Sequence, residues 1–574
     1  MKIIKNLLNR KILQIKLYLW LILLLAALLR IVNISGSPPA LYGDELTTVY
    51  DTYSVLKTGH DQLGDFLPLT FKMSGGRPAG YVYFSIPFVS LFGPSAPGVR
   101  MLSIISGLGI VIVLYLLSRH WFDEKVAAIT ALFAALSPWD INLSRGGYET
   151  HFALFLSVLG IFTFIVARQE PETSIFRSER GFIKSKFQPW LLVIFAICFS
   201  IAVHTYPTYK LTIPLILLVL IFTSGNLRQY LQGKYLLPVI ISALILLVGF
   251  SLVAVQSTTT GSDKRFLAIN IFGQQELQEK IVQKINGERA VSSMPVYLLP
   301  LFHNKYIENS LLIGEGYLSH FSLDFLFIHG DRNPRHNMSL MGQLYLIEIV
   351  LLVIGLAFIA LSNRRLLILL LGWLLIAPLP AALMLEPHAL RSSLMLPPLI
   401  IFSATGLYVL VSHRKEKGMK FLLWTVVFIF FIQFTFFINR IFFLTSNELS
   451  RFWSFPAKIA AQYIMSNKDN FDYVLVSDRI DNIEYAYPVY SQTDPSIIIA
   501  QNKQRDRLGK YEFKRIDNVY IGHIPESEIE SFIGGLNKKV LFIGSPEEAK
   551  SLDNYQLHKG LDALPAFVTA SSEF

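Results

Sequence analysis

The chain has 574 residues, of which 52% are hydrophobic and only 16% are charged. Soluble domains carry about 25% charged residues, so this composition excludes a soluble globular protein and predicts a polytopic membrane protein. The net charge of +10 does not indicate nucleic-acid binding, because the basic residues lie in short loops between apolar segments, where they set topology and suit contact with membrane lipids. The single cysteine, Cys198, lies inside an apolar segment and excludes an intrachain disulfide.

Apolar segments recur along the chain, and a helix needs about 20 such residues to cross a bilayer. We predict about eleven spans, at residues 17–34, 99–118, 126–139, 151–167, 189–204, 211–223, 235–256, 343–361, 366–385, 392–411 and 420–443. Segment 81–92 is shorter and contains Pro87, so we expect it along the membrane interface. The basic start of the chain resembles a signal peptide, but no small-x-small cleavage site precedes Asp44, so we expect an uncleaved first span.

Lysine and arginine mark the cytoplasmic loops of membrane proteins. Here they gather before the first span and in alternate loops after it: Lys2, Lys5, Arg10, Lys11 and Lys16; Arg168, Arg177, Arg180, Lys184 and Lys186; Arg228 and Lys234; Arg364 and Arg365; and Arg414, Lys415, Lys417 and Lys420. This pattern predicts a cytoplasmic N-terminus. An odd number of spans then places the C-terminal tail on the outer side, together with loops 35–98 and 257–342.

The tail reads as a small soluble domain. Residues 455–466 have a helical period, and residues 473–477, 519–522 and 539–544 read as short buried strands. Helical patterns between the strands indicate an α/β unit. We therefore predict two domains: a transmembrane catalytic domain at residues 1–444 and an extracytoplasmic α/β domain at residues 445–574.

Two adjacent carboxylates, Asp44 and Glu45, follow the first span, where the chain meets the outer water. Charged residues at a membrane face are costly, which favours a functional role. The alternative is that they only begin the next helix, because acids favour first turns.

Cationic side chains in the outer loops suit an anionic lipid headgroup, since arginine holds phosphate bidentately and lysine holds it as a point charge. We assign donor-phosphate binding to Arg77, Arg145, Lys210 and Arg391. Further candidates for substrate binding are Glu149, His204, Tyr206, His320, Asp324, Arg335, His336 and His388. For any one cation the alternative is contact with headgroups of the surrounding membrane.

A carboxylate beside a bound phosphate predicts a definite reaction. If an alcohol attacks a sugar carbon, an Asp or Glu can accept the hydroxyl proton as general base. The phosphate then leaves, stabilised by the cations. A lipid phosphate as leaving group explains a site at the membrane interface.

Metal binding is an alternative role for some of these residues. His320, His329 and His336 lie in one loop with Asp324 and Asp331 between them, but their spacing matches no standard zinc pattern. A divalent ion at Asp44 and Glu45 is equally open. The sequence therefore predicts no certain cofactor and leaves a divalent metal as an alternative.

Several segments carry a family resemblance. Tyr42-Gly43-Asp44-Glu45 in the first outer loop, Gly76-Arg77-Pro78, Ser144-Arg145 followed by Glu149, the stretch from His320 through His336 to Tyr345, and His388 to Arg391 resemble the GT-C membrane glycosyltransferases. The similarity is strongest to bacterial relatives of protein O-mannosyltransferases (glycosyltransferase family 39) and lipid A aminoarabinose transferase, over roughly residues 15–411. The resemblance implies Asp44 as general base with Glu45 as its partner, and phosphate contact by Arg77.

The resemblance also implies the fold and the reaction. We expect an α-helical polytopic membrane protein of GT-C type in the bacterial plasma (inner) membrane. It would move a hexose or pentose, with inversion, from a polyprenyl-phosphate-linked donor to a hydroxyl acceptor that is a protein, a lipid or a glycan. Arg77 replaces the lysine of the aminoarabinose enzymes, and the long loop lacks a sugar-binding insertion, so the acceptor stays open.

Other functions compete with this one. A transporter or flippase of lipid-linked sugars would show paired halves with broken helices near the midplane, whereas here no half-to-half repeat is visible and the charges gather on one face. A scaffold protein, which predicts a dispensable Asp44, and a hydrolase that uses the same carboxylates are further alternatives. We expect the tail to shape acceptor choice.

Overall fold

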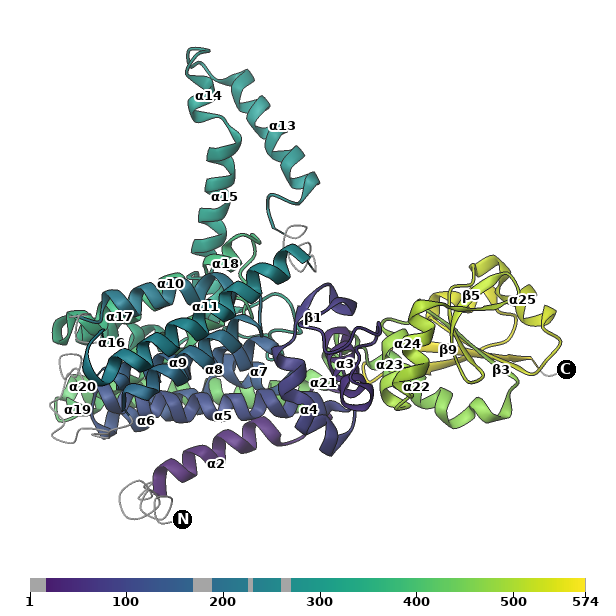
Figure 1. Cartoon of the computed structure of the whole chain (residues 1–574), viewed down its shortest axis with the longest axis horizontal. Coiled ribbons are helices and arrows are strands. Elements are labelled where there is room, and N and C mark those ends of the chain that lie inside the picture. Colours follow the sequence, from purple (N-terminus) through teal and green to yellow (C-terminus); the bar gives the residue numbers. More distant parts are fainter. Residues whose placement is uncertain (1–16, 169–187, 226–230, 260–269, 573–574) are drawn as a thin grey trace.

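The computed structural model describes residues 17–168, 188–225, 231–259 and 270–572. A bundle of helices and a C-terminal region built on a β-sheet follow one another along the long axis (Figure 1). The basic arm before residue 17 and the predicted cytoplasmic residues Arg177, Arg180, Lys184, Lys186 and Arg228 lie outside the described residues.

Each predicted apolar segment contains a helix. The bundle consists of α2 (Leu17–Ile31), α5 (Ala96–Trp121), α6 (Glu124–Leu136), α7 (Pro138–Arg145), α8 (Glu149–Ala167), α9 (Leu191–Val203), α10 (Tyr209–Phe222), α11 (Leu236–Thr259), α16 (Glu348–Ser362), α17 (Arg364–Ile376), α18 (Leu379–Ala382), α19 (Leu396–Ser412) and α20 (Lys417–Asn439).

The predicted number of eleven spans is not confirmed. Within the described residues, seven helices are long and apolar enough to cross a membrane, or eight if the bent pair α6 and α7 forms one span. Helices α2, α9, α10 and α16 have 13 to 15 residues. At 1.5 Å per residue such helices cover only about 20 Å of a hydrocarbon core about 30 Å thick.

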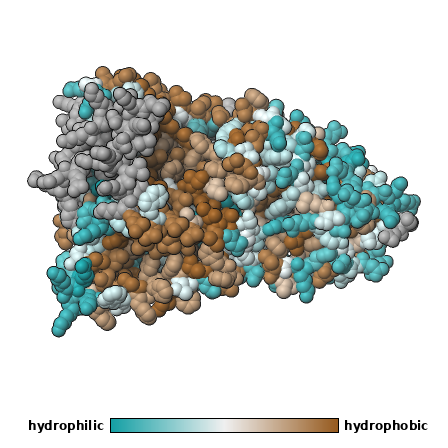
Figure 2. Space-filling model, turned by 90° about the horizontal axis from the view of Figure 1, so that it is seen from below, coloured by the Kyte–Doolittle hydropathy of each residue, from teal (hydrophilic) through white to brown (hydrophobic). Residues whose placement is uncertain are grey.

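Small residues bring some helices into backbone contact. A Cβ atom on Gly355 of α16 would lie 1.9 Å from the carbonyl oxygen of Phe402, and one on Gly406 of α19 would lie 2.0 Å from that of Leu351. Only glycine permits this approach, which is the usual way in which membrane helices pack closely. The outer surface of the bundle is largely hydrophobic, and it turns hydrophilic over the C-terminal region (Figure 2). The chain is an integral membrane protein.

The elements outside the bundle connect it to the C-terminal region or project from it (Figure 1). They are α3 (Gly43–Thr58), β1 (Thr70–Phe71), β2 (Arg77–Pro78), α4 (Gly80–Phe92), α13 (Gln275–Val291), α14 (Leu299–Phe302), α15 (Lys305–Ser319) and α21 (Thr445–Glu448). β1 pairs antiparallel with β2, so that Arg77 stands opposite Phe71.

The C-terminal region carries a seven-stranded sheet in the order β4-β5-β6-β3-β7-β9-β8. Its elements are α22 (Phe455–Asn467), β3 (Tyr473–Ser477), α23 (Ile483–Tyr490), α24 (Pro495–Lys503), β4 (Asp506–Leu508), β5 (Tyr511–Ile516), β6 (Val519–Gly522), α25 (Ile529–Gly535), β7 (Val540–Gly544), β8 (Gln556–Lys559) and β9 (Pro565–Ser572). The predicted helix and three strands are present, and β3 runs parallel to β6 and β7. The four antiparallel strands β4, β5, β8 and β9 were not predicted.

The C-terminal region packs on the segment between α2 and α5. Helices α23 and α24 contact α3. The Tyr50 hydroxyl donates to the carbonyl of Thr493 at 2.8 Å, and the Asn502 amide donates to the carbonyl of Gln62 at 2.9 Å. The segment that carries Asp44 is therefore held between the bundle and the sheet region.

Candidate active site

Asp44 lies in the first turn of α3, and 49% of its side-chain surface is exposed. The nearly buried Arg77 joins it to a second carboxylate. One terminal nitrogen of the guanidinium donates to the Asp44 backbone carbonyl at 3.0 Å, and the other lies 3.3 Å from Asp44 Oδ1. Its Nε lies 2.6 Å from Oε1 of Glu149, the first residue of α8. Of these two carboxylates, Asp44 is the one open to a substrate.

Glu45 lies in a different environment from Asp44. Its side chain is fully buried, and its two oxygens accept from Nε and a terminal nitrogen of Arg100, each at 2.8 Å. The backbone N–H of Gly147 also donates to Glu45, at 2.7 Å. The remaining donors of Arg100 reach the carbonyls of Ile34, Pro38 and Ala40. The pair thus fastens α3 to α5 and to the chain that leaves the first helix.

Arg145 lies away from this cluster. Its side chain is buried, and its guanidinium donates to the carbonyls of Ser37, Leu29 and Val32 at 2.6, 2.9 and 3.0 Å. These carbonyls end α2 and follow it, where a helix leaves its last acceptors without partners. These contacts use Arg145 to close that helix end.

Tyr206 is near a further cation, Arg391. Burial raises the pKa of Tyr206 to about 12; the charge and hydrogen bond of Arg391 lower this pKa, whereas the charges of Glu149 and Asp44 raise it. Arg391 and the two carboxylates therefore all act on the Tyr206 hydroxyl. Arg391 also contacts the Met384 sulfur.

Lys210 and His204 flank Tyr206 in the same loop. Lys210 is half-buried in the first turn of α10. Burial lowers the pKa of His204, and the positive charge of Lys210 lowers it further. The His204 Nε2 lies 3.0 Å from the carbonyl of Gly249, to which it donates, so this ring is held against α11.

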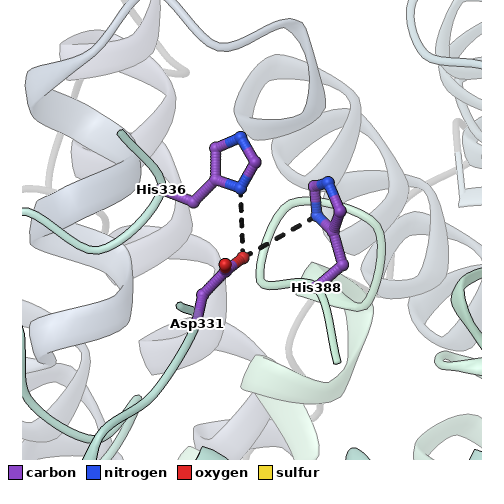
Figure 3. Close-up of side chains that lie close together, drawn as sticks. All are labelled: Asp331, His336 and His388. Atoms are coloured by element: carbon purple, nitrogen blue, oxygen red, sulfur yellow. Dashed lines mark hydrogen bonds and ion pairs between the residues drawn. The ribbon is translucent and has the colours of Figure 1, made fainter. Parts of the chain in front are cut away.

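Asp331, His336 and His388 form a compact group from two loops (Figure 3). Nδ1 of His336 lies 3.1 Å and Nδ1 of His388 3.9 Å from Asp331 Oδ2, and the three ligand atoms lie within 4.8 Å of one another. The His388 Nδ1 is buried and has no hydrogen-bond partner among the described residues. Two imidazoles and a carboxylate are a donor set typical of zinc.

Asp331 is charged in this setting. Burial raises its pKa, but the hydrogen bond from His336 and the backbone N–H of Ala389 hold the pKa at about 2. Of the three histidines that the sequence offered as metal ligands, only His336 belongs to the group. His320 instead donates from Nδ1 to the carbonyl of Gly316 and accepts the backbone N–H of His388 at Nε2.

The remaining candidates lie at the surface. Asp324 pairs with His329, and both side chains are exposed. Arg335 donates from Nε to the carbonyl of Phe452 at 2.8 Å, and its guanidinium lies 5.7 Å from the centre of the Tyr42 ring. Arg335 therefore joins the long loop before α16 to the chain that enters the C-terminal region.

Sequence reasoning missed two buried arginines that shape the site. Arg100 pairs with Glu45, and Arg30 pairs with the buried Asp140. Both stand inside or at the edge of an apolar run, and a charged residue there is rare unless it is paired. This was the available signal for both, although the sequence could not name their partners.

Comparisons with known proteins show which family and which solved structures the chain resembles. Residues 77–253 match the sequence model of the family described as dolichyl-phosphate-mannose-protein mannosyltransferase. ArnT from Cupriavidus metallidurans, solved with undecaprenyl phosphate, superimposes with a TM-score of 0.52 at 13% identity, covering 96% of this chain and 98% of that one. No curated protein sequence matches the chain.

A weaker likeness extends to the archaeal oligosaccharyltransferase AglB from Archaeoglobus fulgidus, solved with an inhibitory peptide and a dolichol-phosphate. The TM-score is 0.47 at 16% identity, and the likeness covers 82% of this chain and 63% of that one. The chain thus spans less than two thirds of the length of AglB. The protein has the fold of ArnT and resembles the GT-C membrane glycosyltransferases of the protein O-mannosyltransferase and ArnT type.

Proposed function

We propose that the protein transfers a sugar from a polyprenyl-phosphate-linked donor to a hydroxyl acceptor on the outer face of a bacterial plasma membrane, with inversion at the sugar carbon. The observation that carries this proposal is the half-exposed Asp44, held by Arg77 within reach of further cations around Tyr206. The match of residues 77–253 to the mannosyltransferase family and the ArnT-like fold support it.

Asp44 is the proposed general base. The acceptor hydroxyl attacks the sugar carbon bonded to the donor phosphate, and its proton passes to Asp44 while the carbon–oxygen bond to the phosphate breaks. Arg77 orients Asp44 by contacting both its carboxylate and its backbone carbonyl. Displacement in a single step inverts the configuration of the carbon.

Arg391, Lys210 and Arg77 are the proposed phosphate contacts. Together with Asp44 and Glu149 they give three positive and two negative groups, which suits the single negative charge of a phosphodiester donor. The phosphate gains charge as the sugar leaves, and preplaced cations stabilise that developing charge. Tyr206 is hydrogen-bonded to Arg391 and is proposed to help position it.

Glu45 is proposed as a positioning residue. Its buried pairing with Arg100 fixes the first turn of α3, and therefore the direction in which Asp44 points. Arg145 is proposed to have a similar positioning role at the end of α2, because its guanidinium donates to backbone carbonyls there. The phosphate role predicted for Arg145 stays a prediction.

A divalent metal fits the group of Asp331, His336 and His388. The buried and unpartnered Nδ1 of His388 faces a charged carboxylate, which is a free ligand position. When bound, a metal such as zinc supplies a fixed positive charge. His388 stands three residues before Arg391 in the same loop, so the metal would anchor the loop that presents Arg391. We propose that a bound metal would have this structural role, and we assign no step of the transfer to the ion.

The experiment is transfer by the full-length protein in lipid vesicles, using a panel of polyprenyl-phosphate hexoses and pentoses with protein, lipid and glycan acceptors. Release of polyprenyl phosphate measures turnover, and NMR of the product gives its anomeric configuration. We expect release with one donor class and an inverted product. A retained configuration contradicts single-step displacement and indicates a double displacement. Release of free sugar without transfer to any acceptor supports a hydrolase, and movement of intact donor across the vesicle membrane without release supports a flippase.

A further inference from the structure

Helices α13, α14 and α15 form a hairpin that projects sideways from the bundle, across the direction of the spanning helices (Figure 1). Its root is tied to a span: α15 contacts α18, and the Tyr317 hydroxyl donates to the carbonyl of Leu375 at 2.8 Å. Leu375 lies in the candidate span Arg364–Ala382, about 10 Å below its outer end at 1.5 Å per residue. The hairpin therefore leaves the bundle within the outer leaflet.

The contact between α13 and α15 contains polar pairs. Lys284 of α13 lies 2.7 Å from Glu308 of α15, and the Gln278 amide donates to the side chain of Asn309 at 3.0 Å. Near the tip, Arg289 donates from Nε to the carbonyl of His303 at 2.9 Å. Only Ile281 and Ile285 add fully buried apolar side chains on α13.

Apolar side chains instead cover the tip and the outward face of α15. Their exposed fractions run from 55% to 87%, and the residues are Val291, Val296, Tyr297, Leu301, Phe302, Tyr306, Leu311 and Leu318. A hairpin in water buries most such residues. Here α15 exposes Tyr306, Leu311 and Leu318 and buries Glu308 against α13, which indicates an apolar surrounding on that side.

The outward face of α13 is polar. It carries the exposed residues Gln275, Glu276, Glu279, Lys280 and Gln283. In Figure 1, α13 lies on the side of the C-terminal sheet region and α15 on the side of the far end of the bundle. The polar helix α13 therefore faces the outer water, and the apolar face of α15 is turned towards the interior of the membrane.

We propose that residues 275–319 form an interfacial arm that lies flat in the outer leaflet, with α14 and α15 among the lipid chains and α13 at the water surface. The arm continues the lipid-facing surface of the bundle, because exposed Leu375 and Leu379 lie beside its root. Tyr297 and Tyr306 suit the headgroup level. Residues 299–328 are apolar enough to be a candidate span, but α15 lies across the bundle and carries Lys305, Glu308 and Glu315, so this segment lies in the membrane plane.

The test places a fluorophore at single cysteines in full-length Cys198→Ala protein reconstituted in phosphatidylethanolamine–phosphatidylglycerol vesicles. Leu311→Cys and Leu318→Cys probe α15, and Glu279→Cys and Gln283→Cys are matched positions on α13. Quenching is measured with doxyl-labelled lipids and with aqueous iodide. We expect lipid quenching to exceed iodide quenching several-fold at the α15 positions, and the opposite order at the α13 positions.

Equal and strong iodide quenching at all four positions would place the arm in water and overturn the proposal. Protection of the α15 labels from both quenchers would also overturn it, because a protein surface would then cover that face. Ser310→Cys, at an exposed position of α15 that is not apolar, gives the same test where a Leu311 or Leu318 variant fails to fold. Lipid quenching at α13 would exclude the proposed orientation.

Discussion

Two neighbouring acids in one helical turn have different environments. Successive helical residues point about 100° apart, so Glu45 faces Arg100 in the interior while Asp44 faces outward at 49% exposure. The family resemblance implied Asp44 as general base and Glu45 as its partner. The sequence could not show that Glu45 pairs with Arg100, because that residue stands 55 residues away on α5.

The buried Glu45–Arg100 pair makes a prediction about stability. Glu45→Ala leaves a buried arginine without its charge partner, which we expect to cost about 3–5 kcal/mol. Thermal unfolding in detergent or nanodiscs measures the loss. Asp65→Ala is the matched control, since Asp65 pairs with Lys72 at the surface and its removal costs about 0–1 kcal/mol. Similar unfolding temperatures for both variants would contradict the role assigned to Glu45.

The buried Asp51 of α3 should make the stability of the protein depend on pH. Burial raises the pKa of this carboxyl to about 7. Below the ordinary pKa near 4 both states are protonated. As pH rises towards 7 the unfolded chain releases the proton and the folded chain retains it, so stability falls across this window by roughly 2–4 kcal/mol and is level above it. Asp51→Asn should therefore gain stability over wild type between pH 4 and 7. A pH-independent difference in unfolding temperature would refute this.

At the scale of elements, apolar runs predicted helices well because hydrophobicity is a local property. The lengths of the helices were predicted less well. The apolar run 211–223 forms a helix that contains Pro214 and is too short to cross a membrane alone. The strands β4 and β8 were missed because their residues are mostly half-buried or exposed and form no apolar run. The group of Asp331, His336 and His388 was missed because it joins two loops far apart in sequence.

That group predicts metal binding. Zinc should bind the purified, metal-free protein at one site by calorimetry, and His388→Ala should weaken the binding by at least tenfold, because it removes one of three ligands. His329→Ala is the matched control, since His329 is exposed and pairs only with Asp324. Equal zinc binding by wild type and both variants would exclude the site.

At the scale of the whole molecule, the C-terminal region supports the candidate site. Trp453 is fully buried where the chain enters this region. Its ring meets Tyr42 edge-on with 5.1 Å between centroids, and the Arg100 guanidinium lies 5.2 Å from the ring. One side chain thus contacts both the residue before α3 and the partner of Glu45. We propose that the region orders the site as well as shaping acceptor choice.

Trp453→Ala tests this connection. The cavity should destabilise the protein by about 3–5 kcal/mol and lower turnover, since the start of α3 loses its support. Phe452→Ala is the matched control, because Phe452 is 45% exposed. Unfolding temperature and turnover are measured for both. A Trp453→Ala protein that unfolds and turns over like the Phe452→Ala protein would show that the C-terminal region does not support the site.

The central claim is that Asp44 accepts the acceptor's proton, and the most direct measurement is turnover of Asp44→Asn. Asparagine keeps the shape and the contact with Arg77 but cannot take a proton, so polyprenyl-phosphate release should fall on the order of 10²-fold or more, with donor binding retained. Asp65→Asn, in the same outer loop, should remain as active as wild type. Full activity in Asp44→Asn would contradict the account and move the base to another carboxylate, of which Glu149 is the nearest candidate.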